Sequence, residues 1–238
     1  MRYLFPLLII SVLMFLPKKV LADENANDSI DAQIQLALKY IDGDSVVADT
    51  LKGISILENL AKQGNTKAMY NLGRIYATIN NKDIDKAIYW YTEASKYKYS
   101  PAQYELGQIY HHGDGVNQNH EIGLYWYRMA AMQNYCPAFK ALYDAYLYGN
   151  GVEQNKKVAI SYLKRAAETG DAEAQTTLGV KYDIGDVVSK NPQQAVYWYR
   201  KAAEKKYYCP IQPWCLLFQW DWYRKRFCTG SILVGKGC

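Results

Sequence analysis

Histidines and cysteines are the residues of this 238-residue chain best suited to chemistry. His111, His112 and His120 flank one short segment that also contains Asp114. Imidazole and carboxylate groups both bind Zn²⁺, but a metal site needs ligands that converge from fixed elements. Adjacent histidines usually point apart, and this segment has the composition of a solvated loop. We therefore expect no metal ligand and no bound cofactor here.

Catalytic arrangements of other kinds are missing from the sequence. No glycine-rich loop lies between a strand and a helix, as phosphate binding would require. The carboxylates are scattered without an evident pair for acid–base catalysis, and no serine lies in a nucleophile elbow. We therefore expect no catalytic residues and a protein that is not an enzyme.

A repeat dominates the chain. Five segments begin with Ala, followed four positions later by Leu and eight positions later by Tyr. The leading residues are Ala32, Ala68, Ala102, Ala138 and Ala174. The residues that follow them are Leu36, Leu72, Leu106, Leu142 and Leu178, and then Tyr40, Tyr76, Tyr110, Tyr146 and Tyr182. These spacings place Ala, Leu and Tyr on one helical face. We call this predicted element helix A.

A second helix, helix B, is predicted in each repeat. Glycine follows the leading alanine by eleven positions in four repeats and is expected to close helix A in a left-handed conformation. These residues are Gly43, Gly113, Gly149 and Gly185. The second repeat lacks this glycine and is two residues shorter, so we expect its loop to close differently. In helix B a large aromatic precedes a small alanine by four positions, as in Trp90 and Ala94, or Trp126 and Ala130. We expect each such pair to form a knob and a recess on one face.

These motifs resemble the Sel1-like repeat family, which is related to tetratricopeptide repeats. The resemblance covers residues 31–66, 67–100, 101–136, 137–172 and 173–208. It implies an all-α fold, a right-handed α-solenoid of stacked antiparallel helix pairs in which each pair covers the next. Many bacterial members are exported adaptors that bind a protein or peptide on the concave face. The resemblance thus implies an interaction scaffold.

Partner-binding residues are expected on the exposed face of helix A. The candidates are Gln103, Gln108, Lys140, Asp144 and Lys181. Two other functions remain open. Some cysteine-rich relatives resemble penicillin-binding proteins, which implies an enzyme acting on the cell wall or on β-lactams. The chain could also be a truncated, frameshifted copy with impaired function.

The cysteine-rich relatives carry a cysteine pair in each repeat, whereas this chain has Cys136 and Cys209 two repeats apart. Packed helices are separated by about 8–10 Å, so these positions would lie tens of ångströms apart. A disulfide needs Cα atoms within about 7 Å. We therefore expect no Cys136–Cys209 disulfide.

The N-terminus has the pattern of a secretory signal peptide. Arg2 precedes a short apolar run, and residues 20–22 read Val-Leu-Ala. The run is shorter than the roughly 20 apolar residues of a membrane-spanning helix. We expect cleavage after Ala22, a short linker over residues 23–30, and a periplasmic or secreted protein without a membrane anchor. An uncleaved anchor is the alternative.

The basic charge of the chain belongs to its ends. Of 28 Lys and Arg, three precede residue 23 and four follow residue 208; of 23 Asp and Glu, one follows residue 208. Residues 23–208 therefore hold 21 basic and 22 acidic residues. A nucleic-acid-binding protein would carry a basic patch on its folded body. We expect no nucleic-acid partner.

Residues 209–238 form an atypical tail rich in Trp and Cys. A sixth repeat is due near residue 210. With permitted codons, a shifted reading frame from Ile211 onward can encode both helix signatures and a Gly-x-Gly loop at the right spacing. We interpret the tail as an out-of-frame sixth repeat. The alternative is a genuine terminal cap, which would need a polar outer face.

Overall fold

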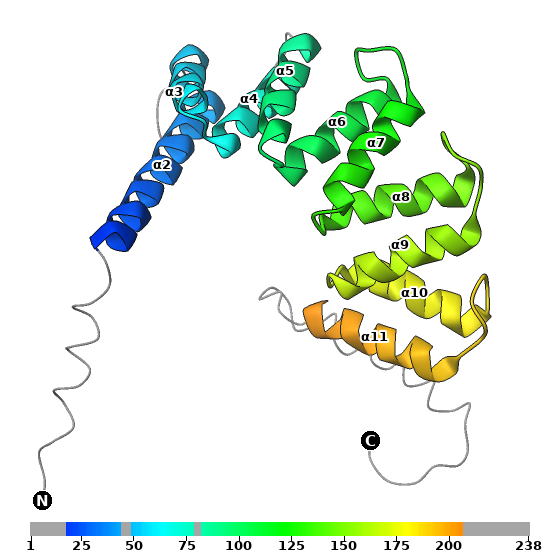
Figure 1. Cartoon of the computed structure of the whole chain (residues 1–238). Helices are drawn as coiled ribbons and strands as arrows, with labels where there is room; N and C mark the ends of the chain where they lie inside the picture. The colour runs from blue at the N-terminus through cyan, green and yellow to red at the C-terminus, as the bar shows by residue number, and fades with distance from the viewer. Residues whose placement is uncertain (1–17, 44–48, 79–81, 207–238) are drawn as a thin grey trace, which may run out of the picture. The chain divides into compact units, whose positions relative to one another are not determined.

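A computed structural model of the chain describes residues 18–43, 49–78 and 82–206 (Figure 1). The described residues form ten helices and no strand, which confirms the all-α solenoid. The helices A are α2 (Lys18–Asp42), α4 (Thr66–Thr78), α6 (Ser100–His112), α8 (Cys136–Tyr148) and α10 (Ala172–Ile184). The helices B are α3 (Thr50–Lys62), α5 (Ile84–Lys96), α7 (His120–Ala131), α9 (Lys156–Glu168) and α11 (Pro192–Lys206).

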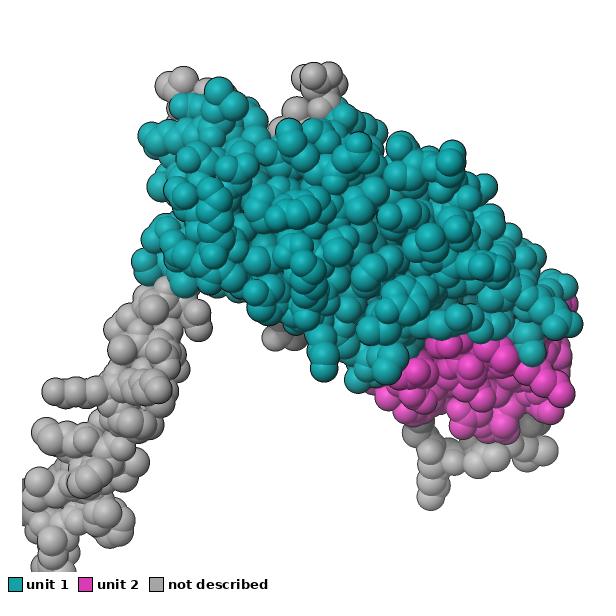
Figure 2. Space-filling model, turned by 45° about the horizontal axis from the view of Figure 1, so that its top comes forward, with its two compact units in different colours: residues 1–155 teal, residues 156–238 magenta. Residues whose placement is uncertain are grey.

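The chain divides into two compact units (Figure 2). Unit 1 comprises residues 1–155 and contains α2 to α8, and unit 2 comprises residues 156–238 and contains α9 to α11. Within each unit every helix packs against the next one along the chain. A helix between two others buries two of its faces, which is how a stack of thin helix pairs makes a continuous core.

The leading alanine and its leucine lie in this core in four repeats. Ala68, Ala102, Ala138 and Ala174 are buried, and so are Leu72, Leu106, Leu142 and Leu178. The first repeat differs, because Ala32 is exposed and Leu36 is 42% exposed. In the part of the chain that the structure describes, no helix pair precedes α2, so this face has nothing to pack against. The prediction of a buried face was therefore wrong for the first repeat.

Helix A and helix B approach closely where a glycine of one faces a tyrosine of the other. A Cβ built on Gly73 would lie 2.5 Å from Cδ1 of Tyr91, and one on Gly179 would lie 2.7 Å from Cε1 of Tyr199. Gly107 faces Tyr127 in the same way. A side chain at these glycines would overlap the ring, so the ring occupies the space that a glycine leaves.

In α5 and α7 the buried aromatic is therefore one residue later than expected, whereas in α11 the expected Trp198 is buried. Tyr91 and Tyr127 are fully buried, whereas Trp90 and Trp126 are partly exposed. The alanines of the expected pairs, at positions 94, 130, 166 and 202, are buried as predicted. Ala87, Tyr91 and Ala94 form the buried stripe of α5 at helical spacing.

One backbone hydrogen bond closes the helix A–helix B hairpin in every repeat. The N–H of the residue that caps helix B donates to the carbonyl of the repeat tyrosine near the end of helix A. The donor–acceptor pairs are Asp49–Tyr40, Asp83–Tyr76, Asn119–Tyr110, Asn155–Tyr146 and Asn191–Tyr182, at 2.7–3.0 Å. We call this bond the hairpin latch. It is present in the second repeat as well. Residues 79–81 of that loop lie outside the described residues, so how the loop closes without a glycine stays a prediction.

The latch residue also starts helix B. The side chain of Asn119 accepts a hydrogen bond from the N–H of Ile122 at 3.0 Å, and Asp83 accepts from Lys86 in the same way. Asp and Asn are preferred N-caps because their side-chain oxygen satisfies an N–H of the first turn. At the other side of the loop, Gly113 and Gly149 close helix A with left-handed φ values of 76° and 79°, as predicted.

Several expectations concern other parts of the chain. Helix α2 includes residues 23–30, for which a linker was expected; their sequence DENANDSI lacks the Gly and Pro that would break a helix. Most of the proposed signal sequence, Cys209 and the atypical tail lie outside the described residues. Among the described helices, none combines the length and the apolarity needed to cross a membrane.

Candidate partner-binding face

A mixed polar and aromatic surface runs over three helices A of unit 1. It consists of the residues two, three and six positions after each leading alanine, and we call it the helix-A face. Its members are Tyr70, Asn71 and Arg74 on α4, Tyr104, Glu105 and Gln108 on α6, and Lys140, Ala141 and Asp144 on α8. All are at least partly exposed. Helices α4 and α6 contact each other directly, although α5 lies between them in sequence.

Three of the five predicted partner-binding residues lie on this face. Gln108, Lys140 and Asp144 are on it, and the side-chain amide of Gln108 donates a hydrogen bond to the Tyr104 hydroxyl. The charged residues of the face are two basic ones, Arg74 and Lys140, and two acidic ones, Glu105 and Asp144. The face therefore carries no net excess of either sign.

The structure corrects the prediction that Gln103 lies on the exposed face of helix A. Its side chain is 1% exposed and accepts a 2.7 Å hydrogen bond from Nε2 of Gln133, so it does not lie on the exposed side of α6. The same position holds Met69 and Phe139 in neighbouring repeats, both buried. Comparing these residues across the repeats could have identified the position as a core position.

The structure also corrects the prediction that Lys181 lies on the exposed face of helix A. It lies seven positions after its leading alanine, where Ile75 and Ile109 are buried in other repeats. Its side chain is 19% exposed, and its ammonium group pairs with Asp186 Oδ2 at 2.6 Å. Lys181 belongs to unit 2 and holds the loop after α10 rather than facing outward with the other candidates.

Two equivalent clusters of tyrosines each include one tyrosine of the helix-A face. In the first, Tyr70 packs against Tyr91 and Tyr99 with ring centroids 5.9 and 5.5 Å apart. In the second, Tyr104 packs against Tyr127 and Tyr135 at 5.6 and 5.7 Å. We call these the tyrosine triads. Tilted aromatic pairs at such distances stabilise beyond their buried area.

Glu105 is the acidic residue associated with both triads. The hydroxyl of Tyr70 donates to its Oε1 at 3.5 Å, which is long for such a bond. Burial raises the pKa of Glu105, and the Tyr70 hydrogen bond and Arg74 oppose that shift. Burial also raises the pKa of Tyr70 to about 12, with the Glu105 charge as the next cause. The carboxylate is thus partly withdrawn from water and weakly compensated.

Sequence reasoning missed the triads and Glu105. The repeat spacing of the tyrosines could have revealed the triads. Tyr70 and Tyr104 follow their leading alanines by two positions, and Tyr99 and Tyr135 are 36 positions apart. The positions of the tyrosines within the repeat distinguish those that reach the surface.

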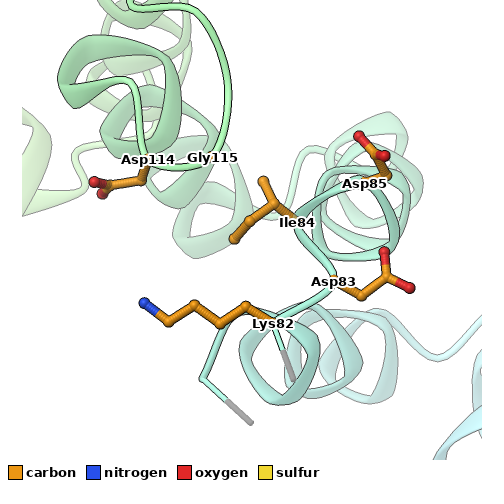
Figure 3. Close-up of a pocket in the computed structure, with 6 residues that line it drawn as sticks. All are labelled: Lys82, Asp83, Ile84, Asp85, Asp114 and Gly115. Atoms are coloured by element: carbon orange, nitrogen blue, oxygen red, sulfur yellow. The ribbon is translucent and has the colours of Figure 1, made fainter. Parts of the chain in front are cut away.

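An open hollow of about 620 Å³ lies between the second and third hairpin loops (Figure 3). Figure 3 shows Asp83 and Asp85 on one side of Ile84, and Asp114 with the Lys82 ammonium on the other. Asp83 already caps α5 and pairs with Lys86 at 3.0 Å. This hollow is therefore explained by loop packing and is a weaker candidate than the helix-A face.

The three histidines lie at the helix ends that flank the loop, as expected from the sequence. His111 is in the last turn of α6 and His120 begins α7. Their Nδ1 atoms are 3.3 Å apart, and the His111 ring also packs against His112 and Tyr127. Burial lowers the pKa of His111, and His120 and His112 lower it further. Among the described residues, no three His, Cys, Asp or Glu side chains converge as a metal site.

Comparison with known proteins agrees with this fold. The model of the Sel1 repeat matches at residues 30–65, 66–96, 100–135, 141–171 and 172–207. The chain belongs to the Sel1 repeat family. Sel1 repeat proteins generally act as scaffolds for protein interactions, and the fold is generally not catalytic. No curated protein matches the chain.

Solved Sel1 repeat structures are similar to this one. A Sel1 repeat protein from Oxalobacter formigenes is 28% identical with a TM-score of 0.65, over 74% of this chain and 73% of that one. The protein c5321, a protective antigen of uropathogenic Escherichia coli with an SLR fold, is 30% identical with a TM-score of 0.64. That match takes in 80% of this chain and 41% of the longer antigen. These Sel1 neighbours support the solenoid and its family.

Proposed function

We propose that this Sel1 repeat protein is a non-enzymatic scaffold that binds a segment of a protein partner along the helix-A face of unit 1. The observation that carries the proposal is the face itself. It presents aromatic and charged side chains, all at least partly exposed, from three successive helices A. Interfaces are enriched in Tyr and Arg, and this face offers Tyr70, Arg74 and Tyr104.

The direct contact between α4 and α6 supports the choice of side. In a curved stack of helix pairs, the helices on the inner side approach one another, and the inner side forms an extended concave surface. A partner segment lying across α4, α6 and α8 would meet one group of face residues from each repeat. We therefore propose the helix-A face as the concave binding surface.

Site-specific photo-crosslinking tests the proposal. A benzophenone amino acid at Gln108 in the full chain is expected to form a discrete crosslinked product with a partner in the source cell, identified by mass spectrometry. Tyr125, which is exposed on helix B of the same repeat, is the matched control position. Equal products from Gln108 and Tyr125 would contradict the proposal. So would the absence of any product from Asn71, Gln108 and Asp144.

The signal-like N-terminus extends the proposal to location. We propose that the scaffold acts outside the cytoplasm, in the periplasm or after secretion, and that the partner is a protein of that compartment. The basic residue, apolar run and small residues at the start of the chain support this.

A further inference from the structure

Glu105 lies at the surface with its carboxylate partly buried between two helices A. Glu105 accepts the long Tyr70 hydrogen bond and feels the positive charge of Arg74, and among the described residues it forms no ion pair. A carboxylate taken out of water is costly unless a cation compensates it. A cation from another molecule would add to the partial compensation that Arg74 provides.

The surroundings of Glu105 are suited to a particular cation. Tyr70 and Tyr104 belong to the two tyrosine triads and flank Glu105 on α4 and α6. The faces of aromatic rings attract guanidinium groups. The Tyr70 ring already does so within the chain, since the Arg74 guanidinium carbon lies 6.0 Å from its centroid.

We propose that Glu105 and the flanking Tyr70 and Tyr104 form a binding site for one arginine side chain of the partner segment. This inference rests on the proposed function and specifies the chemistry of its ligand. Arginine fits better than lysine because guanidinium is planar, stacks on aromatic rings, pairs with both carboxylate oxygens and is more weakly hydrated.

The site occurs once in unit 1, which gives the bound segment a register. The positions equivalent to Glu105 are Asn71 in α4 and Ala141 in α8, neither of which is charged. The tyrosine at the equivalent of position 104 is replaced by Lys140 in α8, which would repel a second arginine. A partner segment is thus selected by one arginine at a defined place.

Peptide titration of the full chain tests the inference. The probe is acetyl-Gly-Ser-Gly-Arg-Gly-Ser-Gly-amide, and the matched peptide has citrulline, a neutral analogue of arginine, at the central position. Binding is followed by NMR shifts of Glu105 and the flanking tyrosines. The arginine peptide is expected to bind roughly tenfold more tightly than the citrulline peptide.

Two variants with opposite expected effects sharpen the test. Glu105→Gln removes the charge and is expected to abolish the preference for arginine. Arg74→Gln removes a resident cation next to the site and is expected to tighten arginine binding by roughly twofold to fivefold. Glu121→Gln, an exposed carboxylate on α7, is the control and is expected to leave binding unchanged.

Several outcomes would overturn the inference. The first is equal binding of the arginine peptide, the citrulline peptide and a third peptide with lysine at the central position. The second is a retained preference for arginine in Glu105→Gln. The third is no saturable binding of the arginine peptide at roughly millimolar concentration. If Gln108 still crosslinks a partner while the peptides show no arginine preference, the arginine site fails and the proposed function stands. If none of Asn71, Gln108 and Asp144 crosslinks a partner, the proposed function itself fails.

Discussion

The backbone of Gly107 in α6 lies against the ring of Tyr127 in α7, so closely that a Cβ at residue 107 would overlap Cδ1 and Cε1 of that ring. The first repeat has Ala37 and Leu57 at the equivalent positions, and both are fully buried. The second, third and fifth repeats thus pair a glycine with a tyrosine, whereas the first has an alanine and a leucine at these positions.

We expect Gly107→Ala to lower the free energy of unfolding by about 1–3 kcal/mol. Overpacking against Tyr127 outweighs the roughly 1 kcal/mol that alanine gains over glycine in a helix interior. Urea denaturation measures the change. The double variant Gly107→Ala with Tyr127→Leu reproduces the pair of the first repeat and is expected to lose less than the sum of its single changes. Strict additivity would show that the ring contact is not the cause.

Asn119→Ala removes the N-cap of α7 and is expected to cost about 1 kcal/mol, because an N–H of the first turn loses its acceptor. The hairpin latch itself is a backbone bond and remains. Asn117, exposed in the same loop, provides the control, and its change to alanine is expected to stay within roughly 0.5 kcal/mol. Thermal unfolding of both variants measures the difference. Equal losses would show that the cap contributes nothing specific.

The pH dependence of stability is expected to include a contribution from His111. Its pKa is lowered in the folded protein by burial and then by His120 and His112, so the unfolded chain binds a proton more readily. The contribution of neutral His111 to stability is therefore fully present above the ordinary pKa of 6.5 and is lost as the pH falls below that value. His111→Gln is expected to flatten the slope of melting temperature against pH, and His112→Gln is the comparison. An unchanged slope in His111→Gln would contradict this assignment.

The contribution of Glu105 to stability changes with pH in the opposite direction. Burial raises its pKa above the ordinary value of 4.5, so the folded state holds the proton more tightly and loses stability as the pH rises through that interval. Glu105→Gln is expected to raise the melting temperature at neutral pH. The gain should disappear in acid, where Glu105 is itself neutral. A lower melting temperature for the variant at neutral pH would mean that the carboxylate is already well compensated.

Processing of the N-terminus is a further prediction. If the signal sequence is cleaved after Ala22, the mature protein begins at Asp23, and intact-mass measurement of exported protein detects this. Ala22→Arg places a large charged residue at the cleavage point and is expected to block processing. A membrane-bound chain that keeps residues 1–22 would favour the uncleaved anchor instead.

The solenoid was predictable because the period of 34 or 36 residues repeats the same helix faces five times. Leu72, Leu106 and Leu178 are buried as the spacing of four and eight residues requires. The spacing does not show which neighbour covers a face, and so it failed for Leu36, which has no described helix pair before it. It also could not separate Trp126 from Tyr127, since adjacent helical residues both border the same face.

The candidate site was predicted only in part, for a related reason. Gln108, Lys140 and Asp144 lie on the helix-A face, but polarity alone suggested Gln103 and Lys181 as well. Each of these two satisfies its polar group within the fold, Gln103 through Gln133 and Lys181 through Asp186. Such pairings between distant residues depend on tertiary geometry that residue type does not reveal. Glu105 was missed because its importance comes from the tyrosines around it.

The hairpin latch separates the pairing of two helices from the loop that joins them. Asp83 follows Tyr76 by seven positions and Asn155 follows Tyr146 by nine, yet both pairs form the same bond. A foreign segment inserted between Gly151 and Gln154 would leave both partners of that bond in place. Long surface insertions cost little closure entropy. These hairpin tips are therefore natural positions for epitope tags or displayed peptides, and they allow a repeat protein to acquire new surface features without altering its core.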